Sequence, residues 1–105
     1  MVTESLHSTD AVVARLQSLR PAIREEYNVE LLGLFGSRAR GDNRPNSDVD
    51  VAYRWASEEV GSLLDLGGIW SDLNTVFGVI VSLVDWDNSR ASFRERASQD
   101  LIRLE

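Results

Sequence analysis

Two aspartates, Asp48 and Asp50, lie one residue apart in a run of strand-forming residues. In a β-strand, residues i and i+2 point to the same face, so the two carboxylates are expected to project side by side. Adjacent like charges repel each other, and a cation between them relieves that repulsion. A hard divalent ion that prefers oxygen ligands, such as Mg²⁺, suits this arrangement. The spacing predicts a metal-binding pair, although two such acids alone could equally form the solvated face of a half-buried strand.

A glycine-serine turn precedes the two acids. Residues 36–41 read Gly-Ser-Arg-Ala-Arg-Gly, follow an apolar run at residues 31–35, and are separated from Asp48 by a polar loop at residues 41–47. The backbone N–H groups of such a turn, together with the Ser37 hydroxyl, can bind phosphate oxygens. The turn alone would be ordinary, but placed before the acid pair it predicts a site for a nucleoside triphosphate.

The composition excludes several classes of protein. The chain has 105 residues, and we expect residues 1–105 to form one domain with a modest core. It has no cysteine, and all 11 basic residues are arginine, which excludes thiolate metal sites, lysine nucleophiles and the Gly-Lys-Ser/Thr phosphate loop. No membrane span or signal peptide is recognisable, and the net charge of -6 argues against non-specific nucleic-acid binding. These features predict a cytoplasmic protein.

Hydrophobic periodicity predicts the element order α, β, β, α, β, α, with a further short strand at the end. Helices are expected at residues 8–26, from residue 58 or 62 to residue 77, and at residues 89–98. Strands are expected at residues 29–35, 49–55 and 79–84, and at 101–104. Pro21 predicts a break after Arg20 or a second short helix that begins at the proline. Trp70 lies on the apolar stripe of its helix and is expected in the core.

These elements predict an α/β (α+β) fold, a small mixed sheet of three or four strands with helices packed on one face. The apolar positions of the helices would then form the core with one face of the sheet. The two acids would lie on the other face, open to a substrate.

The Gly36-Ser37 turn and the run Ser47-Asp48-Val49-Asp50, in this order and strand context, resemble the signature of the DNA polymerase beta-like nucleotidyltransferase superfamily. The short chain and the wording Leu-Phe-Gly-Ser-Arg-Ala-Arg-Gly are similar to the minimal members of that superfamily, small proteins often paired with a HEPN-domain toxin. The resemblance covers residues 31–86. It implies a nucleotidyltransferase-like fold that uses ATP and Mg²⁺, with a two-metal site as one arrangement.

The resemblance also implies a role for each matching residue. The metal ligands would be Asp48 and Asp50. The nucleotide-binding residues would be Gly36, Ser37, Arg38, Arg40 and Ser47. Arginines pair bidentately with phosphates, but those at 38, 40 and 44 could also be solvated loop charges, and Arg40 could pair with Asp42. We expect one of these three arginines to be functional.

The chain departs from the family pattern at the third carboxylate. The superfamily usually supplies an acid from the strand after the second helix, whereas this chain reads Val81-Ser82-Leu83-Val84-Asp85, with Ser82 at the expected position. Asp85 is the nearest substitute, but in a regular strand it faces the opposite side of the sheet from Ser82. Asp87 is a more remote candidate. A serine hydroxyl can hydrogen-bond but does not accept a proton at neutral pH as a carboxylate does.

Three functions follow from these residues and the resemblance. The first is an enzyme that transfers AMP from ATP to a hydroxyl, by resemblance a tyrosine of a partner HEPN toxin, so that the protein acts as an antitoxin. The second is a degenerate, inactive nucleotide- or toxin-binding antitoxin, because Ser82 replaces the third acid. The third and weakest is a small-molecule modifier, such as an aminoglycoside nucleotidyltransferase, which usually needs a second domain. A homodimer is compatible with each.

Overall fold

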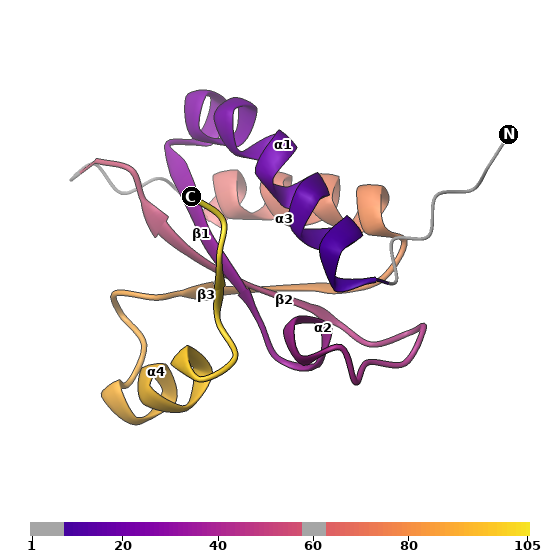
Figure 1. Cartoon of the computed structure of the whole chain (residues 1–105). Helices are drawn as coiled ribbons and strands as arrows, with labels where there is room; N and C mark the ends of the chain where they lie inside the picture. Colours follow the sequence, from indigo (N-terminus) through magenta and orange to yellow (C-terminus); the bar gives the residue numbers. More distant parts are fainter. Residues whose placement is uncertain (1–7, 58–62) are drawn as a thin grey trace, which may run out of the picture.

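The computed structural model describes residues 8–57 and 63–105, and these ranges contain four helices and four strands (Figure 1). In chain order they are α1 Thr9–Tyr27, β1 Val29–Phe35, α2 Ser37–Arg40, β2 Val49–Trp55, α3 Leu63–Phe77, β3 Val81–Asp85, α4 Ala91–Ser98 and β4 Ile102–Arg103. The predicted order is confirmed, with the short helix α2 added where a plain turn was expected. Residues 58–62, one predicted start of the second long helix, lie outside the described residues.

The four strands form one mixed sheet in the order β3-β2-β1-β4. β1 runs antiparallel to both β2 and β4, whereas β2 and β3 are parallel. The predicted mixed sheet of three or four strands is therefore confirmed. β2 is a central strand and β3 is at the edge of the sheet, so the two acids of β2 lie beside the strand that carries Ser82.

The main core lies between one face of the sheet and the helices α1 and α3. Val49 and Val51 of β2 point into it and are fully buried, together with Leu16 of α1 and Ile69 of α3. Because side chains alternate along a strand, Asp50 points to the other face. Tight packing of these aliphatic side chains fixes the register that the acids depend on.

α4 lies on the opposite face of the sheet from α1 and α3 (Figure 1). Its Phe93 and Ala97 pack in a second, smaller apolar cluster with Phe35 and Ala52 of the sheet. The expectation that the helices pack on one face therefore holds for α1 and α3 and is wrong for α4. The physical reason is that Phe35 and Ala52 make part of this face apolar, and α4 buries it.

Two local predictions are also wrong. α1 continues through Pro21 without a break, because Leu16 and Ile23, before and after the proline, are both buried against the sheet. Trp70 is 46% exposed rather than in the core, where the neighbouring Ile69 is fully buried instead. In the part of the chain that the structure describes, no helix is long and apolar enough to cross a membrane.

Candidate active site

Gly36 lies directly against the carboxylate of Asp50. Phe35, the last residue of β1, is opposite Asp50 in the antiparallel register with β2, and Gly36 follows it. A Cβ atom placed on Gly36 would lie 2.3 Å from Oδ2 of Asp50, and the φ of Gly36 is +79°. Both the left-handed backbone and the lack of space require glycine at this position. The structure thus brings the Gly-Ser turn and the second acid together.

Ser37 begins the single-turn helix α2 directly after this contact. The N–H groups of Ala39 and Arg40 donate to the carbonyl of Gly36 at 3.0 and 3.1 Å. The first N–H groups of a helix have no acceptor within the helix. Those at the start of α2, with the Ser37 hydroxyl, are donors placed beside Asp50 that an anion could use.

Asp50 and Ser82 are neighbours in the sheet. They are partners in the parallel register between β2 and β3, so their side chains share one face. Burial raises the pKa of Asp50, the charge of Asp48 raises it further, and the charge of Arg40 opposes both. Asp48 is exposed at the start of β2, whereas Asp50 is half-buried. The carboxylate pair therefore has an inner member, whose ionised form is disfavoured, and an outer member in contact with solvent.

Asp85 and Asp87 lie away from this pair. Asp85 is paired in register with Tyr53, and β3 is regular between Val81 and Asp85, which places Asp85 on the opposite face from Ser82. The Nδ2 of Asn88 donates to it at 2.8 Å. Asp87 forms an ion pair with Arg54 at 3.1 Å. The structure does not bring a third acid to Asp50 from this strand.

The donor set suits a cation that carries other oxygen ligands with it. Among residues 8–57 and 63–105, no group of three His, Cys, Asp or Glu side chains is close enough together to hold a metal ion. Asp48, Asp50 and the Ser82 hydroxyl are oxygen donors, and burial and the charge of Asp48 raise the pKa of Asp50 despite the opposing charge of Arg40. Mg²⁺ is commonly bound by one or two carboxylates plus substrate phosphates. The residues fit such a shared site but not a metal site made by protein alone.

Arg38 holds the loop between the turn and the acids. It is 1% exposed. Its Nη2 donates to the carbonyls of Pro45 at 3.1 Å and Ser47 at 2.8 Å, and its own carbonyl accepts from Oγ1 of Thr9 at 2.6 Å. A guanidinium group buried in this way is not available to a ligand. The structure therefore gives Arg38 a role in positioning Asp48 and Asp50, one that its sequence context did not indicate.

Ser47 and Arg40 also have partners of their own. The Ser47 hydroxyl accepts from the N–H of Arg44 at 2.8 Å and so closes the loop. Arg40 pairs with Asp42 at 3.1 Å, one of the alternatives that the sequence left open, and with Asp100 at 2.8 Å, and its side chain remains 46% exposed. Since its charge acts on Asp50, Arg40 is the predicted arginine that remains close to the site and accessible.

A hollow of about 280 Å³ adjoins Gly36 on the face of the sheet that carries Asp50. It is lined by Phe35, Gly36, Arg40, Phe93, Arg96, Ala97 and Asp100. Arg96 and Phe93 come from α4, and the sequence did not indicate them because nothing local shows that α4 crosses to this face. The available signal for a basic residue at this site was Arg96 itself, which stands in the last turn of the last helix.

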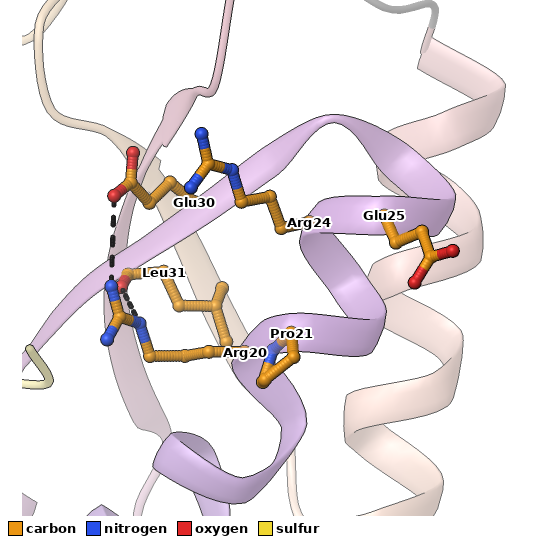
Figure 2. Close-up of a pocket in the computed structure, with 6 residues that line it drawn as sticks. All are labelled: Arg20, Pro21, Arg24, Glu25, Glu30 and Leu31. Atoms are coloured by element: carbon orange, nitrogen blue, oxygen red, sulfur yellow. Dashed lines mark hydrogen bonds and ion pairs between the residues drawn. The ribbon is translucent and has the colours of Figure 1, made fainter.

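Two larger hollows lie elsewhere. One, of about 480 Å³, runs between α3 and β3 and includes Asp48 and Ser82 in its lining. The other, of about 530 Å³, lies between α1 and β1 around Arg20 and Arg24 (Figure 2). Figure 2 shows Arg20 donating to the Leu31 carbonyl, at 3.1 Å, and forming an ion pair with the Glu30 carboxylate, at 3.7 Å. This second hollow is near the start of β1, at the other end of the strand from Gly36, and is not part of the site.

Comparisons with known proteins identify the family and the fold. The sequence profile of the family "Polymerase beta, Nucleotidyltransferase" matches residues 17–104. The protein adenylyltransferase MntA of Thermococcus cleftensis is 35% identical over 87 residues, which are 83% of this chain and 86% of that protein. A structure assigned to a minimal nucleotidyltransferase superposes with a TM-score of 0.73 at 26% identity, covering 94% of this chain and 98% of the other.

Two toxin–antitoxin crystal structures share the fold. One contains AMP-PNP and matches with a TM-score of 0.67 at 19% identity, over 85% of this chain and 72% of the other. The second, MntA–HpeT, carries two aspartate-to-glutamate substitutions two residues apart and matches with a TM-score of 0.64 at 16% identity, over 85% and 71% of the chains.

Arg38→Ala should destabilise the protein by about 2–3 kcal/mol, because it removes a fully buried side chain and its hydrogen bonds to the Pro45 and Ser47 carbonyls. Urea unfolding measures this change. Arg44→Ala removes an exposed arginine from the same loop and is the matched control, expected to change the free energy of unfolding by less than about 0.5 kcal/mol. Equal effects of the two variants would show that Arg38 does not hold the loop.

Asp50→Asn should stabilise the metal-free protein at pH 7. The folded-state pKa of Asp50 is raised, so its ionised form is less stable in the folded chain than in the unfolded chain. The penalty is present above the folded pKa and disappears below about pH 4, the ordinary aspartate value, where the group is protonated in both states. Thermal unfolding at pH 7 and pH 3.5 should therefore show a higher Tm for the variant only at pH 7. A gain of equal size at both pH values would contradict the electrostatic origin.

Proposed function

Because the chain belongs to the polymerase beta nucleotidyltransferase family, we propose that it transfers AMP from ATP to a hydroxyl group on a partner toxin and so acts as an antitoxin. The relative from Thermococcus cleftensis, named a protein adenylyltransferase, supports the nucleotide and the type of acceptor. The two toxin–antitoxin structures with this fold support the partner. The resemblance noted in the sequence assigns that partner to the HEPN class.

One observation carries the proposal. The Gly-Ser turn rests on the carboxylate of Asp50, with the Gly36 Cβ position only 2.3 Å from Oδ2. A triphosphate bound at the start of α2 would therefore lie next to the acid pair. The spacing of Asp48 and Asp50 also equals that of the two substituted aspartates in the MntA–HpeT structure.

Asp48 and Asp50 would hold Mg²⁺, which when bound neutralises phosphate charge and polarises the reacting phosphoryl group. Gly36 and Ser37 would hold phosphate oxygens through backbone N–H groups and the hydroxyl. Arg40 and Arg96 line the hollow beside Gly36 and would add positive charge to it, offset in part by Asp100. Phe93 would give that hollow an apolar wall suited to a nucleoside.

The reaction transfers one adenylyl group and balances without a redox partner. The acceptor oxygen bonds to the α-phosphorus of ATP, the bond from that phosphorus to the oxygen bridging the α- and β-phosphates breaks, and this oxygen leaves as part of pyrophosphate. The proton of the acceptor hydroxyl passes to solvent, because Ser82 cannot accept it at neutral pH. General base assistance typically contributes about 10²- to 10⁴-fold in rate, so we expect a slow enzyme.

The alternative is a binding protein that neutralises its toxin without chemistry. The observation that favours it is the absence of a third acid near Asp50 among the described residues. The retained carboxylate pair favours the enzyme, because a half-buried Asp50 with a raised pKa costs stability and a pure binder would gain nothing from it.

Asp50→Asn should abolish formation of an AMP adduct on the partner toxin, with a fall in rate of at least about 10³-fold. Intact-protein mass spectrometry with ATP and Mg²⁺ measures the adduct. Asp72→Asn is the matched control, since Asp72 is on α3, which covers the other face of the sheet, and accepts from the Tyr27 hydroxyl at 3.0 Å; this variant should retain the wild-type rate. An adduct that forms unchanged with Asp50→Asn would overturn the assignment of the site.

Ser82→Asp should raise the transfer rate by about 10²- to 10⁴-fold, because it adds a proton acceptor beside Asp50. Single-turnover kinetics of adduct formation measure this change. An adduct found only with Ser82→Asp, and not with the wild type, would favour the binding-protein alternative. No gain in any variant would show that Ser82 does not occupy the position of the third acid.

A further inference from the structure

Two exposed apolar side chains line the same hollow as Asp48. Trp70 of α3 is 46% exposed and Ile80, which precedes β3, is 58% exposed. Both line the hollow of about 480 Å³ that also includes Asp48 and Ser82. Large exposed hydrophobic side chains gathered in one place are typical of surfaces that bind another molecule. The hollow is therefore a largely apolar groove that reaches Asp48, the outer acid of the pair, and Ser82, the register partner of Asp50.

The floor of this groove is the free edge of β3. β3 is the first strand in the sheet order, and no strand within residues 8–57 and 63–105 pairs with its outer side. Val49 N–H donates to the Ile80 carbonyl and Trp86 N–H donates to the Tyr53 carbonyl. Backbone groups alternate in direction along a strand, so Val81, Leu83 and Asp85 point theirs away from β2.

One of these outward groups already has a partner. The Val81 N–H donates to Oδ1 of Asn74 at 2.7 Å. The backbone of Leu83, two residues further on, lies along the groove, which Leu83 also lines. An extended segment pairing with Leu83 would continue the sheet, the binding mode called β-augmentation.

The charge of the edge is negative at both ends. Asp48 lies beside Ile80 at one end of β3, and Asp85 is the last residue at the other end. This distribution favours a segment with apolar residues in its middle and basic residues on either side. It disfavours a second copy of this chain, because antiparallel pairing of two β3 edges would bring Asp48 of one copy toward Asp85 of the other.

We propose that this groove binds an extended, basic-flanked segment of the acceptor protein and presents its hydroxyl to Asp48 and Asp50. The inference rests on the proposed function, since it names the surface that the acceptor uses. Side chains of an added strand alternate between the faces of the sheet. One of them would lie on the Ser82 face, and the small Ser82 side chain leaves the way to Asp50 open.

Kinetic measurements with the partner toxin as acceptor test the groove. Ile80→Arg places a positive charge in the path of a basic segment and should raise the KM for the toxin by about tenfold or more. The KM for ATP should not change. Ile80→Asp removes the same apolar contact but keeps the attractive charge, so it should raise the KM for the toxin less than Ile80→Arg does.

Leu64→Arg is the matched control. Leu64 is 87% exposed on α3 and does not line the groove, so its substitution should leave both KM values unchanged. If Leu64→Arg and Ile80→Arg raise the KM for the toxin equally, the acceptor binds through general electrostatics and the groove is not its site.

Amide hydrogen exchange provides a readout that does not depend on catalysis. Binding of the toxin should slow exchange at the Leu83 amide. If exchange at the Leu83 amide becomes slower as the protein concentration is raised in the absence of the toxin, the edge belongs to a homodimer and the proposal is overturned. Transfer with unchanged toxin KM and no protection at Leu83 would overturn the groove but not the proposed function. Protection at Leu83 without any adduct would overturn the proposed function but not the binding of the toxin in the groove.

Discussion

The contact between Gly36 and the Asp50 carboxylate is the constraint on which the rest of the site depends. It exists because β1 ends opposite Asp50 and the chain then turns with a positive φ that only glycine adopts without strain. The turn starts α2, and the buried Arg38 of α2 reaches forward to the carbonyls of the loop that leads back to β2. Turn, loop and acids thus form one covalent and hydrogen-bonded unit whose parts cannot move independently.

The two faces of β2 serve opposite purposes. Val49 and Val51 are fully buried against α1 and α3, and this packing anchors the strand. Asp50, between them in the sequence, is directed to the other face, where burial and the charge of Asp48 disfavour its ionised form. The apolar core therefore offsets the cost of a carboxylate that adds nothing to folding, a common relation between stability and function in active sites.

Local patterns were sufficient to predict the acid pair and the Gly-Ser turn that meets it, but not what surrounds them. The acid pair and the Gly-Ser turn were predictable because alternation and turn chemistry are properties of a few adjacent residues. The burial of Arg38 was not, since it depends on carbonyls seven and nine residues away that a loop brings back. The exposure of Trp70 and the position of α4 on the second face depend on which apolar surfaces compete for the core, and periodicity alone does not settle that competition.

The site has two unlike sides, and the replacement at residue 82 bears on both. Near Gly36 the walls carry arginines and an aromatic ring, which suit a polyanionic nucleotide. Near β3 the walls are apolar and the strand edge is open, which suits a peptide. A carboxylate at position 82 would stand beside Asp50, whose pKa is already raised by burial and by Asp48, and a third negative charge would raise the cost of all three. Serine avoids that cost. In the proposed reaction its small side chain also leaves room for an acceptor side chain at the edge of the sheet, and the proton transfer that a carboxylate would provide is lost.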